Sequence, residues 1–214
     1  MESKVFVTFQ EYISHYCIDI NYLKKGCDLP QHWDNDNLFI DKWSEFDKQY
    51  SQKMYRLDRF PTLIQDWEKH RQLVVFFDKR KEPEEQCDYL EIERKFLRVI
   101  KNLWTCSRIF VESSIHYDNI FPKWANQNKV KELQKKFNAN NIEIIEGVEW
   151  EELEFLLILN FRNYISTCLS FVDLNLIIWP GDFACPTYLR DEANRELLEK
   201  ICNVEGLYLY PLTS

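Results

Sequence analysis

The chain has 214 residues, of which 45% are hydrophobic, 29% charged and 15% aromatic, and this composition predicts a folded domain rather than a disordered chain. Its net charge of -8 disfavours a general binder of nucleic acid or of anionic membranes, because such binders need a cationic surface. Four glycines are too few to favour a fold with a glycine-rich phosphate loop.

The N-terminal part, about residues 1–70, has the apolar spacing of helices. In the first predicted helix the spaced residues are Phe9, Tyr12, Ile13 and Tyr16. A loop rich in turn residues over positions 26–37 separates it from a second predicted helix over residues 39–54. The segment QLVVFFD, residues 72–78, is β-branched and aromatic, so we expect a buried strand there.

The middle of the chain alternates helix-like and strand-like patterns. Residues 88–104 have a strong amphipathic pattern and predict a helix. Residues 107–113 follow as a predicted strand. A polar and basic helix opening at Pro122 is predicted over residues 122–137, and residues 142–146 predict a third short strand.

The C-terminal third begins with an ambiguous segment. Residues 151–164 suit either a buried strand or a helix whose first turn is acidic, and the acidic start favours the helix. Residues 169–173 and 176–180 predict a hairpin. A helix over residues 191–202 and a strand over 207–210 close the chain.

These elements predict a single α+β domain over residues 1–214, with a mixed or antiparallel central sheet flanked by helices. Several of the predicted strands are too short and too close in sequence for regular right-handed crossovers, so a doubly wound parallel sheet is the less favoured alternative.

The N-terminal sequence and the cysteines predict a cytoplasmic protein. No secretory signal pattern opens the chain, and the longest wholly apolar run, residues 155–159, is far shorter than the ~20 residues of a membrane span. Seven cysteines cannot all pair within one chain, and no CxxC spacing occurs among them. We therefore interpret most of them as reduced, small core residues.

The histidines and cysteines do not have the spacing of a metal site. The four histidines form neither an HxxxH nor an HExxH pattern. Cys27 and His32 share a loop, but a structural zinc ion needs four ligands. The sequence thus predicts neither a metal nor a cofactor.

One loop carries a candidate nucleophile and a carboxylate close to it. In WPGDFACPTY a turn could expose the sulfur of Cys185 close to Asp182, with His32 or His116 as further partners. A small hydrolase-like enzyme is the alternative function that this loop suggests. A neighbouring carboxylate raises a thiol pKa, however, and a structural loop is the favoured interpretation.

Two segments are acidic without an intervening basic residue. Residues 82–93 contain the first set, and residues 143–161 contain the second, which surrounds an aromatic residue. Acidic side chains around an aromatic anchor suit the capture of a basic protein, although solvated helix surfaces are the simpler alternative. The predicted partner-binding residues are Glu82, Glu84, Glu85, Asp88, Glu146, Glu149, Trp150, Glu151, Glu152 and Glu154.

Two passages resemble bacterial immunity proteins, the cytosolic partners of toxins of the contact-dependent growth inhibition or polymorphic type. One passage is the helix and strand of residues 89–114, and the other is the hairpin and acidic turn of residues 169–183. In such families the turn continues with Asp-Arg-Gly, whereas here it reads Pro180-Gly181-Asp182-Phe183. The resemblance implies neutralisation of a basic toxin domain, most plausibly a nuclease, by tight binding without catalysis.

Overall fold

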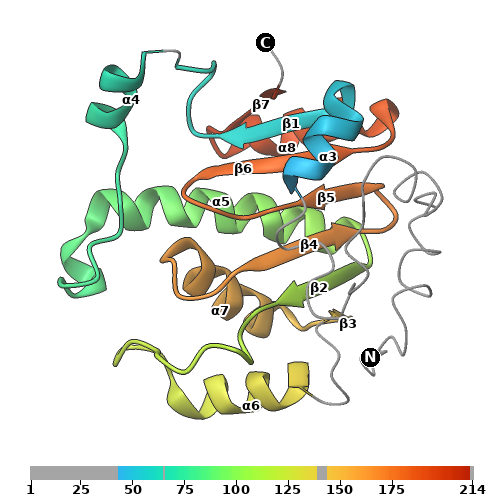
Figure 1. Ribbon diagram of the computed structural model, residues 1–214. Helices are drawn as coiled ribbons and strands as arrows, with labels where there is room; N and C mark the ends of the chain where they lie inside the picture. The colour runs from blue at the N-terminus through green and yellow to red at the C-terminus, as the bar shows by residue number, and fades with distance from the viewer. Residues whose placement is uncertain (1–42, 65, 139–143, 213–214) are drawn as a thin grey trace.

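The computed structural model describes residues 43–64, 66–138 and 144–212. Within these ranges one antiparallel sheet has the strand order β3-β2-β4-β5-β6-β1-β7 (Figure 1). Its strands are β1 Met54–Asp58, β2 Ile109–Ser113, β3 Ile144–Glu146, β4 Thr167–Phe171, β5 Leu176–Ile178, β6 Ala184–Leu189 and β7 Tyr208–Pro211. Every pairing is antiparallel, which confirms the α+β fold class with an antiparallel central sheet.

The helices lie on both faces of this sheet. They are α3 Trp43–Tyr50, α4 Trp67–Leu73, α5 Cys87–Cys106, α6 Gln127–Asn138, α7 Trp150–Phe161 and α8 Arg195–Val204, with short 3₁₀ turns at Ser51–Lys53, Pro83–Glu85 and Glu192–Asn194. The helices α5, α7 and α8 cover one face, whereas α3 crosses the other face at β1 and β6 (Figure 1). No helix among the described residues combines the length and the apolar composition that crossing a membrane requires.

The hydrophobic core lies between the sheet and the layer of α5, α7 and α8. Alternate residues of each strand point into it, such as Leu169 and Phe171 of β4. They meet residues of the helices that are fully buried, such as Phe96 of α5 and Leu157 of α7. This packing explains why α5 follows its amphipathic pattern over 20 residues.

Several predicted elements are confirmed. The ambiguous segment after Glu149 is the helix α7, and the hairpin forms between β4 and β5, with Asn175 in the left-handed region at φ 50. The strands predicted over residues 107–113 and 142–146 are present in shorter form as β2 and β3, and the strand predicted over 207–210 is present as β7, shifted by one residue. The prediction of one domain over residues 1–214 stays a prediction, because residues 1–42 lie outside the described part.

The prediction of an all-helical part up to about residue 70 is wrong for its described portion. The helix predicted over residues 39–54 ends at Tyr50 in α3, and β1 begins at Met54. The strand forms because β6 and β7 pair with both of its edges, and Leu57 is buried between the sheet and the helices. Such long-range pairing overrides local helix preference.

Two further boundaries differ from the sequence-based prediction. β6 occupies the segment that we expected to be a loop, although Pro186 interrupts its hydrogen-bonding potential. The helix predicted to open at Pro122 begins at Gln127, since the side chain of Asn126 accepts hydrogen bonds from the amides of Asn128 and Lys129. An N-cap of this kind sets where a helix starts more strongly than a preceding proline.

The strand predicted over residues 72–78 is wrong as well. The helix α4 runs through Leu73, and the residues that follow it are extended but belong to no strand of the sheet. They keep the alternation of a strand, because Val75 and Phe77 pack against the core while Phe76 is 61% exposed. The side-chain alternation therefore belongs to an extended segment that lacks the hydrogen bonds to a neighbouring strand.

Candidate protein-binding surface

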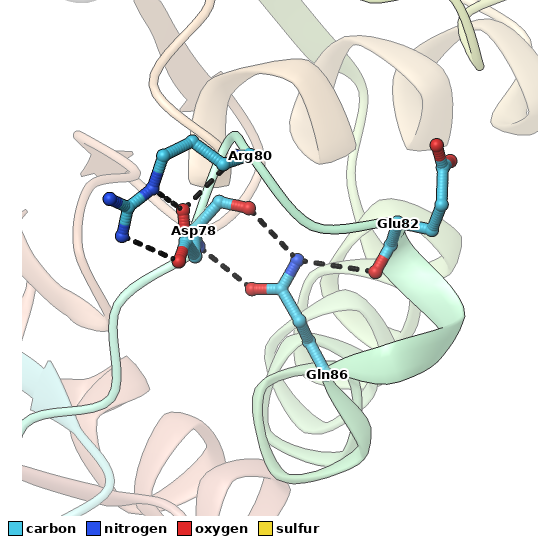
Figure 2. Close-up of polar contacts among 4 residues, drawn as sticks. All are labelled: Asp78, Arg80, Glu82 and Gln86. Atoms are coloured by element: carbon cyan, nitrogen blue, oxygen red, sulfur yellow. Dashed lines mark hydrogen bonds and ion pairs between the residues drawn. The ribbon is translucent and has the colours of Figure 1, made fainter.

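The loop that connects α4 to α5 is held by the side chain of Gln86 (Figure 2). Its Oε1 accepts a hydrogen bond from the amide of Asp78 at 2.7 Å, and its Nε2 donates to the carbonyl oxygens of Asp78 at 3.2 Å and Glu82 at 3.4 Å. Pro83 is buried and opens the 3₁₀ turn before α5. The main chain of residues 78–86 is thereby fixed before any partner binds.

A bidentate ion pair between Arg80 and Asp78 also holds this loop (Figure 2). The guanidinium group of Arg80 donates to both carboxylate oxygens of Asp78 at 2.9 Å, and the amide of Arg80 donates to Oδ1 at 3.0 Å. These hydrogen bonds lower the pKa of Asp78 to about 2. Asp78 thus stays ionised at any physiological pH, and Arg80 is engaged within the loop.

Four acidic side chains of this region are exposed: Glu82, Glu84, Glu85 and Asp88, here named the acidic loop surface. In the described part of the chain none of these carboxylates has an ion pair or a hydrogen bond. Lys79 does not neutralise them, since its Nζ donates to the main-chain oxygen of Asn163 at 2.6 Å and lies 4.3 Å from the centre of the Tyr164 ring. The exposed Lys81 directly precedes Glu82, so the acidic loop surface has an excess of negative charge, with four carboxylates beside the one ammonium group of Lys81.

The last acidic residue of the first run points inward instead. Glu93 is 3% exposed and forms two hydrogen bonds with the guanidinium group of Arg162, at 2.8 and 2.7 Å. The same guanidinium group lies between the rings of Phe77 at 5.0 Å and Trp124 at 4.5 Å. Burial raises the pKa of Glu93, and the hydrogen bonds and charge of Arg162 oppose that rise. This pair joins α5 to the end of α7, and the contact of Arg162 with Phe77 attaches the segment before the acidic loop surface to the same place.

The second acidic run has basic neighbours on α6, whereas the four residues of the acidic loop surface form no ion pair among the described residues. Glu152 forms an ion pair of 2.7 Å with Lys136 of α6, and Lys129 of α6 donates to the main-chain oxygen of Glu151. Glu149 and Glu151 are exposed, and Glu146, Glu152 and Glu154 are half-buried. The polar helix α6 thus partly neutralises this run, which makes it the weaker of the two predicted surfaces.

The prediction that Trp150 is an exposed anchor is wrong. Its side chain is 7% exposed, and its ring lies 6.0 Å from that of Trp104 and 5.1 Å from the Nζ of Lys101. The ring fixes the start of α7 to the end of α5, so the apolar contact stabilises the fold. The exposed aromatic residue near an acidic run is Phe76, which sequence analysis placed in a buried strand. Its position between the core-facing Val75 and Phe77 is the signal that indicates exposure.

The two acidic runs lie at opposite ends of α5. The acidic loop surface flanks its first turn, whereas Trp104 in its last turn contacts Trp150 within the second run. A helix of 20 residues is about 30 Å long. The structure therefore separates the predicted partner-binding residues into two surfaces, rather than joining them around one anchor.

The environment of Cys185 contradicts the alternative of an exposed, nucleophilic sulfur and agrees with the favoured interpretation of a structural role. The residue is fully buried in β6, and burial raises the pKa of its thiol to about 12. Asp182 is exposed and accepts a hydrogen bond of 2.8 Å from the side chain of Asn163. His32 lies outside the described residues. A buried, protonated thiol does not have the properties of a nucleophile.

We expect thiol alkylation to separate the cysteines into two groups. Cys87 and Cys106 are exposed and should react in the native protein, whereas the buried Cys168, Cys185 and Cys202 should react only after unfolding in urea. Peptide mapping by mass spectrometry after treatment with iodoacetamide measures each site. Modification of Cys185 in the native protein as fast as Cys106 would contradict its placement in the core.

The remaining candidate chemistry is sparse. Across the described ranges, no three His, Cys, Asp or Glu side chains are grouped so that they could hold a metal ion. Comparison of the chain with protein-family models, with curated proteins and with solved structures finds no match.

Proposed function

We propose that the chain is a binding protein whose acidic loop surface docks on a basic surface of another protein. The observation that carries this proposal is the group of exposed carboxylates that form no ion pair among the described residues, on a loop that Gln86 and Arg80 hold in one conformation. A fixed loop costs little conformational entropy on binding, and concentrated charge accelerates the encounter with a partner of opposite charge.

The partner in this proposal is a basic toxin domain, and the chain is its immunity protein in the cytoplasm. A nuclease domain has the required chemistry, because it binds nucleic acid phosphates with Lys and Arg side chains. A rigid acidic surface can occupy such a site in place of the phosphates. The free thiols of Cys168, Cys185 and Cys202 are compatible with a reducing compartment.

A charge-reversal variant tests the acidic loop surface. We expect Glu82→Lys/Glu84→Lys/Glu85→Lys to slow association with the partner at least about tenfold and to weaken binding by about a hundredfold. The partner is first captured from the native organism on the tagged chain at low salt and released at high salt. Its association with purified wild-type and variant chains is then measured by surface plasmon resonance at two ionic strengths.

The matched control is Glu68→Lys/Glu132→Lys/Glu196→Lys, which makes the same change in net charge at exposed positions outside both acidic runs. A third variant, Glu149→Lys/Glu151→Lys/Glu154→Lys, tests the second run. If the control slows association as much as the first variant does, the effect comes from net charge and the acidic loop surface is not the binding site. If no basic protein is retained at near one-to-one ratio, the proposed function fails.

A further inference from the structure

Residues 74–78 form an extended segment whose three central residues, 75–77, have no main-chain hydrogen bond among the described residues. Val74 has strand-like backbone angles of φ -71 and ψ 130, and its amide donates to the carbonyl oxygen of His70 at the end of α4. Val75, Phe76 and Phe77 make no hydrogen bond through their main chain within the described structure. The segment lies at the margin of the molecule, between α4 and the start of α5 (Figure 1).

The side chain of Gln86 already occupies one position beside this segment. By accepting from the amide of Asp78 and donating to its carbonyl oxygen, it makes both contacts that an opposing residue makes in a hydrogen-bonded pair of an antiparallel ladder (Figure 2). The three residues before Asp78 have no equivalent neighbour. Residues 75–77 thus have the side-chain alternation of a strand, and the side chain of Gln86 makes at Asp78 the contacts of one hydrogen-bonded pair, which no neighbour continues along residues 75–77.

The composition of the segment suits pairing with another chain. Val and Phe have high β-propensity, and an exposed edge of this kind is a template for strand addition. Val75 and Phe77 are anchored against the core, the latter between Tyr89 at 5.2 Å and the guanidinium group of Arg162. The backbone is consequently held in place on the protein side while Phe76 projects outward.

We propose that an extended, basic segment of the partner pairs with residues 75–77 by β-strand addition and places its cationic side chains on the acidic loop surface. This inference rests on the proposed function and names the form that the partner takes at that site. Main-chain hydrogen bonds supply affinity in this mode of recognition, and alternate side chains supply specificity. Phe76 contacts the apolar side chains of the added strand.

Charge selects this occupant over a second copy of the chain. The segment leads through residues 78–81 into the acidic loop surface, where four carboxylates outnumber the adjacent ammonium group of Lys81, so an added strand lies beside an excess of negative charge. A second copy has a net charge of -8 and is repelled there. A lysine-rich strand is attracted, and a helix cannot pair its main chain with the segment because its own amides are already bonded.

The test uses a peptide of alternating Lys and Val as the probe of a basic strand. The control is the same peptide with every amide N-methylated, which keeps the charge and the side chains but removes the donors that a ladder needs. Binding of both peptides to the full chain is measured by fluorescence anisotropy. Amide hydrogen exchange is followed at residues 74–78 by NMR.

We expect the unmodified peptide to slow hydrogen exchange of at least one amide within residues 75–77 by about tenfold or more. It should also bind at least about tenfold more tightly than the methylated control. Glu82→Lys/Glu84→Lys/Glu85→Lys should abolish its binding. Equal binding of the two peptides, binding without protection of residues 75–77, or no binding would each overturn the strand-addition inference. The proposed function is decided separately by the partner captured on the chain, so its failure is distinguishable.

Discussion

We expect Arg162→Ala to lower the free energy of unfolding by about 3–5 kcal/mol, the range for removing one partner of a buried ion pair. The substitution leaves the carboxylate of Glu93 buried without the two hydrogen bonds of 2.8 and 2.7 Å that it accepts. It also removes the cation between the rings of Phe77 and Trp124. Urea denaturation followed by circular dichroism measures the loss.

The double variant Glu93→Leu/Arg162→Met is the control for this prediction. Replacing both members of a buried pair with apolar residues avoids an isolated charge, so the double variant should be more stable than Arg162→Ala. A double variant that is as unstable as Arg162→Ala would show that lost packing, rather than the isolated carboxylate, causes the effect.

The loss in free energy of unfolding caused by Arg162→Ala should also depend on pH. Burial raises the pKa of Glu93, and without Arg162 less opposes that rise, so the folded variant holds the proton to a higher pH than the unfolded chain does. The contribution of Glu93 to stability is then fully present below its pKa in the unfolded chain. It is lost as the pH rises through its pKa in the folded variant. Relative to the wild type, the variant should lose stability as the pH rises from below the ordinary pKa of a glutamic acid through the raised pKa of the buried Glu93. A deficit that is constant across this range would contradict the assignment to Glu93.

We expect Phe183→Ala to destabilise the protein by about 3–5 kcal/mol, as is typical of truncating a buried phenylalanine. Its ring centre lies 4.7 Å from that of Tyr89, 5.2 Å from that of Phe96 and 5.5 Å from that of Phe161, so it joins α5 to the end of α7. Phe183 also has a φ of 57, which a side chain adopts at a cost that this packing offsets.

Phe76→Ala is the matched control for Phe183→Ala, since it makes the same substitution at an exposed position. Its effect on the free energy of unfolding should stay within about 0.5 kcal/mol. Thermal and urea unfolding of both variants measure the difference. Equal losses would mean that the ring of Phe183 contributes no more than an exposed ring, and the described aromatic cluster would then be wrong.

The parts of the fold that sequence analysis predicted are those whose signals are local. The apolar stripe of α5 repeats at helical spacing over its length, and the β4–β5 hairpin has its turn at Asn175. β1 was missed because its pairing is long-range. β6 was missed because Pro186 locally disfavours a strand, although β6 pairs with the neighbouring β5. The extended segment around Phe76 was predicted as a strand because its residues have the composition and side-chain alternation of one. That pattern does not indicate whether a neighbouring strand is present to form hydrogen bonds with it.

The candidate surface was predicted in part for the same reason. A run of acidic residues with a proline predicts exposure, which holds for Glu82, Glu84 and Glu85. The inward direction of Glu93 depends on Arg162, which is 69 positions away in the sequence. No property of the acidic run itself distinguishes the one carboxylate that has a distant guanidinium partner.

The position of β1 in the sheet has a consequence for synthesis of the protein. β1 lies between β6 and β7, and the side-chain hydrogen bond from Tyr210 to Asp58 joins residues 152 positions apart. This end of the sheet cannot form until the ribosome has released the chain as far as β7, so β1 stays without its partner strands until β6 and β7 have been synthesised. Such late closure between distant parts of the chain is slow, and chaperones that shield apolar segments should therefore affect the yield of folded protein more than its final stability.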